Sequence, residues 1–134
     1  MVDSIDHVVL TSSDLKKTVA FYKNILEMDM KEDFIEEDNS LRYSMHFGNQ
    51  KINIHEVNNI FFPHAKNVKP GTLDICFISK KKLSYWQNKL LKNNINLIEG
   101  PLERSGATSK IISIYCHDPD GNLIEISNLL KNND

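Results

Sequence analysis

Hydrophobic and polar residues alternate along several short stretches of this chain, which is the pattern of half-buried β-strands. In residues 4–10, Val8 and Leu10 fall on one face of the predicted strand, and His7 falls on the other. Similar stretches recur along the chain, separated by turn-forming residues. They lie at residues 28–35, 41–47, 51–57, 72–79, 95–99, 109–117 and 122–127, and Gly100 and Pro101 end the stretch at 95–99.

Two further stretches have apolar residues at the three- and four-residue spacing of an amphipathic helix. They predict helices over residues 14–26 and 80–93. The apolar positions are Leu15, Val19, Tyr22 and Leu26 in the first helix, and Leu83, Trp86, Leu90 and Leu91 in the second. The order strand, helix and three strands therefore occurs twice. The first copy covers residues 1–57, a connection covers 58–71, and the second copy covers 72–130 of a single domain, 1–134.

A tight turn is predicted at residues 118–121, where Pro119 presets φ and Gly121 can adopt positive φ. In the strand that follows, Glu125 lies on the face opposite to Ile124 and Ile126. A buried carboxylate is costly unless it is paired, hydrogen-bonded or bound to a metal. Taken alone, this strand is better explained by a solvated face on which Glu125 is a surface residue.

Three other strands carry a potential metal ligand on the face opposite to their apolar residues. They contribute His7, His55 and Asp74, which join Glu125 on the first and last strands of the two copies. The interval from His7 to Asp74 nearly equals the interval from His55 to Glu125. Two histidines and two carboxylates form a workable ligand set for a divalent transition metal.

Composition limits the classes of function. With 134 residues, 40% hydrophobic and 25% charged, the chain can build one compact core. A formal net charge of −2 gives no basic footprint for nucleic acid. No secretory signal or long apolar segment is visible, so we expect no membrane partner and a cytoplasmic, reducing location. Cys76 and Cys116 lie in predicted strands, where Cys76 is expected to fill the interior.

The sequence resembles the vicinal oxygen chelate superfamily, which includes glyoxalase I, extradiol dioxygenases, fosfomycin-resistance enzymes and bleomycin-resistance proteins. The resemblance covers almost the whole chain and is carried by residues 5–10, 14–26 and 118–125. Residues 50–56, 100–101, 104, 106–107 and 113–115 are similar to a narrower branch of small glyoxalase-domain proteins described as biphenyl-diol dioxygenase-related or virulence-associated. The resemblance implies an α+β fold of two βαβββ modules that form a cupped mixed sheet around a metal.

By position in the family, the implied metal ligands are His7, His55, Asp74 and Glu125, although members often have histidine where this chain has Asp74. The implied ion is Ni, Co, Zn, Mn or Fe. The favoured reaction is lyase or isomerase chemistry on a small substrate with adjacent oxygens, with Glu125 or Asp74 as the base. Members with a single pair of modules often complete the cup with a second chain, which implies a homodimer.

Three alternatives stay open. An extradiol-type dioxygenase would use His7, His55 and Glu125 with open positions for oxygen. A fosfomycin-type transferase would bind an anionic substrate through Arg104, Ser113 and Tyr115, although a surface role for Arg104 is equally plausible. The third alternative is a metal-free binding protein of the bleomycin-resistance type, in which the histidines only line a pocket.

Overall fold

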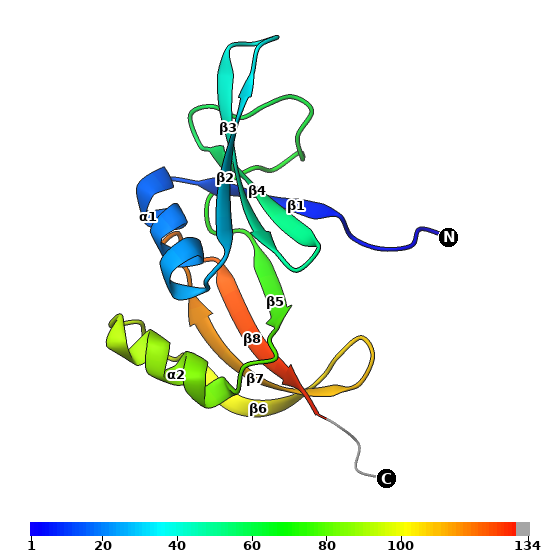
Figure 1. Cartoon of the computed structure of the whole chain (residues 1–134), viewed down its shortest axis with the longest axis vertical. Helices are drawn as coiled ribbons and strands as arrows, with labels where there is room; N and C mark the ends of the chain where they lie inside the picture. The colour runs from blue at the N-terminus through cyan, green and yellow to red at the C-terminus, as the bar shows by residue number, and fades with distance from the viewer. Residues whose placement is uncertain (131–134) are drawn as a thin grey trace. The chain divides into compact units, whose positions relative to one another are not determined.

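The computed structural model describes residues 1–130, and the last four residues of the predicted single domain lie outside this part (Figure 1). The chain divides into two compact units, Met1–Thr72 and Leu73–Asp134. The boundary falls at the end of the predicted connection, residues 58–71. No helix within residues 1–130 has the length and apolar character needed to cross a membrane.

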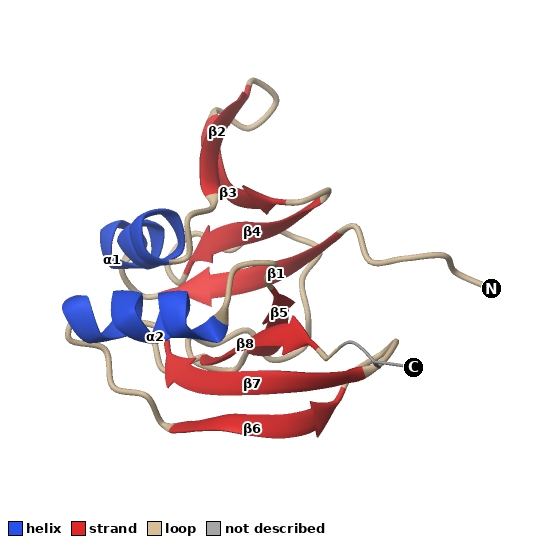
Figure 2. Cartoon of the chain, turned by 60° about the horizontal axis from the view of Figure 1, so that its bottom comes forward, coloured by secondary structure: helices blue, strands red, loops and turns tan. Residues whose placement is uncertain are grey.

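The first unit contains one strand, a helical segment and three further strands. Their bounds are β1 His7–Ser12, α1 Leu15–Val19, η1 Ala20–Ile25, β2 Asp29–Ile35, β3 Ser40–Phe47 and β4 Gln50–Glu56. The four strands form one sheet in the order β1-β4-β3-β2, in which β1 and β4 are parallel and the other pairs are antiparallel (Figure 2).

The predicted helix at 14–26 forms, but it changes from α-helix to π-helix at Ala20. It begins where the Asp14 carboxylate accepts a hydrogen bond from the Lys17 backbone N–H at 3.2 Å, which caps the first turn. In the wider π turn, the adjacent rings of Phe21 and Tyr22 are both buried and meet edge to face, with their centroids 5.0 Å apart. Helical spacing alone did not predict this widened turn.

The second unit repeats the order of the first. Its elements are β5 Asp74–Ile78, α2 Leu83–Lys92, β6 Glu99–Ser105, β7 Lys110–His117 and β8 Leu123–Leu129. The strands form a second sheet in the order β5-β8-β7-β6, in which β5 and β8 are parallel and the other pairs are antiparallel (Figure 2). The predicted α+β class with two βαβββ modules is therefore confirmed.

One strand differs from its prediction. The stretch at 95–99 was expected to end at Gly100 and Pro101, whereas β6 begins at Glu99 and runs through both residues, with a shift of register between Glu99 and Leu102. Gly100 has φ of 103°, and a Cβ at this position would collide with the carbonyl oxygen of Ser113. Only glycine fits the close approach of β6 to β7 here, so this glycine belongs to the strand instead of ending it.

Each sheet has one apolar, buried face, as the alternation predicted. In the first unit Leu10, Met45, Ile52 and Ile54 are buried, and in the second unit Ile114, Cys116, Ile124 and Ile126 are buried. The helix α2 packs on β7 and β8. The opposite face of each sheet carries the polar side chains, which include every candidate ligand.

Candidate functional site

Glu125 stands at the centre of the polar face of the second sheet. Its register partners are Cys76 on β5 and Tyr115 on β7. The Ser113 hydroxyl donates to Glu125 Oε2 at 2.6 Å, and the Ser113 and Ser127 hydroxyl oxygens are 2.6 Å apart. Both serines are fully buried and lie on the same face as Glu125, so two hydroxyl groups hold the carboxylate from its side.

The turn before β8 explains why Glu125 is positioned firmly. The buried Asp118 carboxylate accepts hydrogen bonds from the backbone N–H groups of Asp120 and Asn122, each at 2.9 Å, and from the Asn122 side chain at 2.7 Å. The Asn122 side-chain oxygen then accepts from the Leu73 backbone N–H at 2.9 Å, which ties this turn to the start of β5. The predicted turn therefore fixes the register of the two strands that carry Glu125 and Asp74.

A pocket of about 390 Å³ opens beside Glu125. Its lining consists of Cys76, Ile78, Arg104, Ser105, Gly106, Ala107, Ile111, Tyr115 and Glu125. Arg104 Nε donates to the Tyr115 hydroxyl at 3.1 Å, and Arg104 Nη1 donates to the Glu103 carbonyl at 3.1 Å. The structure thus brings Arg104, Tyr115 and Glu125 to one pocket, while Ser113 does not line it but donates to Glu125. A cation, a phenol and a carboxylate line the same cavity and can bind an anionic oxygen and move a proton.

The charge states in this pocket follow from its surroundings. Burial raises the pKa of the Tyr115 phenol, and the nearby Glu125 adds to this, while the hydrogen bond from Arg104 opposes it. The same hydrogen bond raises the pKa of Arg104. Burial also raises the pKa of the Cys76 thiol, with further increases from Glu125 and Asp74 and an opposing hydrogen bond to Ser127. At neutral pH the pocket therefore presents a cationic guanidinium beside neutral phenol and thiol groups.

Cys76 does not fill the interior as expected, because it is exposed on the polar face. Its thiol lies 3.3 Å from the Ser127 hydroxyl. The cysteine that does fill the core is Cys116, where burial and the nearby Asp118 raise the thiol pKa to about 12. The two cysteines differ in exposure because they lie on opposite kinds of sheet face. Cys76 shares the polar face with Asp74, and Cys116 shares the apolar face with Ile114.

Asp74 begins β5 and is exposed. Its register partner is Leu123, two positions before Glu125, so both carboxylates lie on one face of adjacent strands. The offset corresponds to roughly 7 Å along the strands, which leaves both carboxylates within reach of a shared cation.

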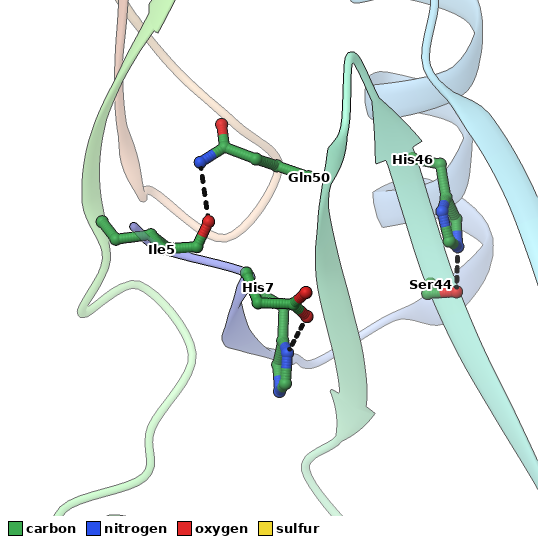
Figure 3. Close-up of polar contacts among 6 residues, drawn as sticks. Ile5, His7, Ser44, His46 and Gln50 are labelled. Atoms are coloured by element: carbon green, nitrogen blue, oxygen red, sulfur yellow. Dashed lines mark hydrogen bonds and ion pairs between the residues drawn. The ribbon is translucent and has the colours of Figure 1, made fainter. Parts of the chain in front are cut away.

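His7 begins β1 in the first unit and is exposed. Its Nδ1 lies 2.8 Å from the Asp6 carboxylate. Figure 3 marks this contact of His7 with a dashed line. This hydrogen bond lowers the pKa of Asp6, so the carboxylate is ionised and Nδ1 is the nitrogen that carries the proton. The preceding Ile5 carbonyl accepts from the Gln50 side chain at 3.1 Å, which holds this segment against the next strand. A neutral imidazole that donates through Nδ1 offers its Nε2 lone pair, which is the usual state of a metal-binding histidine.

His55 lies elsewhere on the same sheet. In the parallel pair of β1 and β4, His7 is opposite Lys51, and His55 is opposite Thr11, four residues further on. This offset is roughly 13 Å along the strands, too far for His7 and His55 to bind one ion. The register therefore argues against an ion shared by His7 and His55 of one chain.

The pairing of the strands also corrects the expectation that His55 in the first module occupies the position that Glu125 occupies in the second. If His7 is matched to Asp74, then Asn53 occupies the position of Glu125 in the other sheet. The ring of His55 instead meets Phe61 edge to face, with centroids 5.1 Å apart. Burial lowers the pKa of His55, and the charges of Arg42 and His64 lower it further.

No group of three or more His, Cys, Asp and Glu side chains in residues 1–130 is arranged to hold a metal ion. Sequence reasoning also missed some polar residues of both sheets. Ser127 shares a strand face with Glu125, so alternation could have identified it. The Ser44 hydroxyl lies 2.9 Å from His46 Nε2 on β3, and alternation likewise places these two residues on one face. Figure 3 marks this contact with a dashed line.

The comparisons with known proteins place the chain in a family. It belongs to the Glyoxalase/Bleomycin resistance protein/Dioxygenase superfamily, whose family model matches residues 4–126. This confirms the resemblance inferred from the sequence. Members of this superfamily commonly use divalent metal ions.

Among its relatives, the chain is 42% identical to Virulence protein STM3117 of Salmonella typhimurium, over 95% of this chain and 85% of the relative. The crystal structure of that protein superposes with a TM-score of 0.88, covering 97% of this chain and 99% of the other. The chain is also 40% identical to Glyoxalase domain-containing protein RDO1 of Mycosarcoma maydis, over 94% of this chain and 68% of the relative. It is 30% identical to Metallothiol transferase FosB of Staphylococcus haemolyticus, over 94% and 84% of the two chains.

Proposed function

We propose that this chain is a metal-dependent enzyme of lyase or isomerase type that acts on a small substrate with two adjacent oxygens. The observation that carries the proposal is the Glu125 carboxylate, which buried Ser113 and Ser127 hold beside a pocket that also contains Arg104 and Tyr115. A carboxylate fixed in this way serves as a metal ligand or as a base without further reorganisation. Family membership supports the same function.

The proposed metal ligands are His7, Asp74 and Glu125, from one chain or from two. Their chemistry suits Ni, Co, Zn, Mn or Fe in the divalent state. His7 fits because its Nδ1 is bonded to Asp6, and Glu125 fits because Ser113 orients its carboxylate. Asp74 and Glu125 share one face at an offset of two residues. His55 is left out of the set because of its register.

When bound, the metal would act as a Lewis acid for the two oxygens of the substrate. Arg104 would bind an anionic group of the substrate through its planar guanidinium, and the Tyr115 hydroxyl would donate to a substrate oxygen. Either Asp74 or Glu125 would take a proton from the acidified carbon, which requires that carboxylate to be ionised.

Proton exchange tests this proposal before the natural substrate is known. With small α-hydroxycarbonyl compounds in deuterated water, the protein should catalyse exchange of the proton beside the carbonyl, detected by NMR. Removing the metal with a chelator should stop the exchange, and returning the metal should restore it. Asp74→Asn with metal retained but exchange lost would identify Asp74 as the base. Oxygen uptake with a catechol would instead indicate the dioxygenase, and an absence of metal, exchange and uptake would leave a binding protein.

A fosfomycin-type transferase is the second candidate. Arg104 and Tyr115 in one pocket suit an anionic substrate, and the chain is 30% identical to a relative named Metallothiol transferase. Loss of free thiol in a mixture of fosfomycin, a small thiol and the protein would favour this reaction. Thiol loss that persists in Arg104→Gln would count against the assignment of the pocket.

A further inference from the structure

Helix α2 and the turn before it carry a local excess of positive charge. Residues 75–98 contain five of the 16 Lys and Arg residues of the chain and none of its 18 Asp and Glu residues, although the whole chain has a formal net charge of −2. We propose that this surface is a docking site for an acidic segment of a partner protein, one that carries an apolar side chain among its carboxylates. The surface, which we call the basic face, consists of Lys80, Lys81, Lys82, Tyr85, Lys89, Leu91 and Lys92.

The basic face lies on the side of α2 that points away from its sheet. Leu83, Trp86 and Leu90 are buried, and α2 packs on β7 and β8 (Figure 1). Tyr85 is 40% exposed and Leu91 is 75% exposed. Because α2 covers the apolar side of the second sheet, a partner on the basic face leaves the pocket on the polar side open.

The start of α2 carries a charge that is unfavourable for the helix itself. A helix N-terminus favours anions, and its cap is normally Ser, Thr, Asp or Asn. Here Lys82 is the N-cap residue and makes no side-chain capping hydrogen bond, and the first turn contains no acidic residue. The Asn128 side chain on β8 accepts from the Leu83 backbone N–H at 3.0 Å instead. Residues that break a local rule of stability are expected at functional sites, and these lysines break two.

The turn that presents the lysines is held firmly. The Asn128 side-chain amide donates to the Ser79 carbonyl at 2.9 Å and to the Lys81 carbonyl at 2.8 Å. The Ser79 hydroxyl accepts from the Trp86 indole at 2.8 Å and from the Lys81 backbone N–H at 3.1 Å. Lys81 Nζ lies 4.4 Å from the centroid of the Tyr85 ring, which orients this side chain along the helix. A turn that is already ordered loses less conformational entropy when a partner binds.

The chemistry of the basic face favours a protein partner over a membrane or a nucleic acid. The apolar stripe of α2 is buried in the second unit, so the helix has no apolar face to insert into a bilayer. All of its cations are lysines, without the arginine forks that bind phosphate groups in pairs. An exposed leucine next to Lys92 instead matches a protein interface with an apolar centre and a polar rim. Carboxylates on the partner supply the complementary charge.

Fluorescence anisotropy of labelled synthetic peptides with the full-length protein tests this proposal. A peptide of glutamate and leucine should bind saturably, a peptide of glutamate and glycine more weakly, and a peptide of glutamine and leucine not at all. The double variant Lys82→Gln/Lys92→Gln should weaken the binding about tenfold, through loss of two exposed ion pairs. Lys16→Gln/Lys17→Gln is the matched control, because it removes two exposed lysines of α1, and it should bind as the parent does. Equal weakening by the two double variants would overturn the proposal.

Lys82→Asp separates binding from folding. It removes a cation and supplies a capping carboxylate at the helix N-terminus, so the melting temperature should rise while the peptide binds more weakly. Weaker binding together with a lower melting temperature would show that Lys82 serves the fold, and would contradict the proposal.

Two further probes test the class of partner. Phosphatidylserine vesicles and oligouridine should bind more weakly than the peptide of glutamate and leucine. Tighter binding of either probe, lost in Lys82→Gln/Lys92→Gln, would assign the basic face to a membrane or to RNA and overturn the proposal. Glu125→Ala should bind the peptide normally, so this surface and the proposed metal-dependent function can fail separately.

Discussion

The two sheets share one topology but differ in how their polar faces are connected. On the second sheet, hydrogen bonds link Cys76, Ser127, Ser113 and Glu125 into one continuous cluster, and Arg104 is joined to Tyr115. On the first sheet, the contacts are local pairs, such as His7 with Asp6 and Ser44 with His46 (Figure 3).

The difference shows that two modules of one topology can organise their polar faces differently. The second face fixes one carboxylate through two buried hydroxyl groups, whereas the polar side chains of the first face make only local contacts. The following predictions test this contrast in order of decreasing effect.

The largest effect concerns the turns before the last strand of each unit. Asp118→Ala removes a buried carboxylate that accepts three hydrogen bonds, so the free energy of unfolding should fall by about 3 kcal/mol. Asn49→Ala, in the corresponding exposed turn of the first unit, should change it by less than about 0.5 kcal/mol. Urea denaturation measures both. Equal effects would show that the two turns are equally important.

The next effect concerns the serines. Ser127→Ala removes the hydroxyl that lies beside Ser113, so metal affinity and proton exchange should fall about tenfold. Ser44→Ala breaks the pair with His46 on the first sheet and should leave both quantities unchanged. Calorimetric metal titration provides a readout that does not depend on the reaction. Equal losses in the two variants would indicate a general effect on folding.

Assembly is a separate prediction, since members of the family with two modules often pair. Light scattering at micromolar concentration should give twice the mass of the 15.4 kDa chain. A monomer that binds metal at full stoichiometry would show that one chain supplies all of the ligands.

The smallest effects concern titration. Burial is the largest cause of the lowered pKa of His55 in the first unit and of the raised pKa of Cys76 in the second, and the charges of Arg42 and Glu125 respectively add to these shifts. Arg42→Gln should therefore raise the pKa of His55, and Glu125→Gln should lower the pKa of Cys76. NMR titration and alkylation rates measured against pH check the two directions. An unchanged pKa in either variant would show that the removed charge does not contribute to the shift.

Much of the fold was predictable because alternation and helical spacing report which residues face the core. They identified both modules and the faces of His7, Asp74 and Glu125. Alternation shows which face of a strand a residue occupies, but it does not give the register of that strand with its neighbour. His55 was therefore correctly placed on the face of His7, but its register partner is Thr11, four residues after His7 on β1. Gly100 was misjudged for a related reason, since the close approach of β7 that requires glycine depends on tertiary contact.

The most direct test of the account is metal affinity in three proteins: the parent, Glu125→Ala and His55→Ala. We expect Glu125→Ala to lose more than about 100-fold, because even the partners of a metal ligand contribute 10- to 100-fold. His55→Ala should bind within about threefold of the parent, since its register separates it from His7. Parent-like binding by Glu125→Ala, together with loss in His55→Ala, would contradict the proposed site.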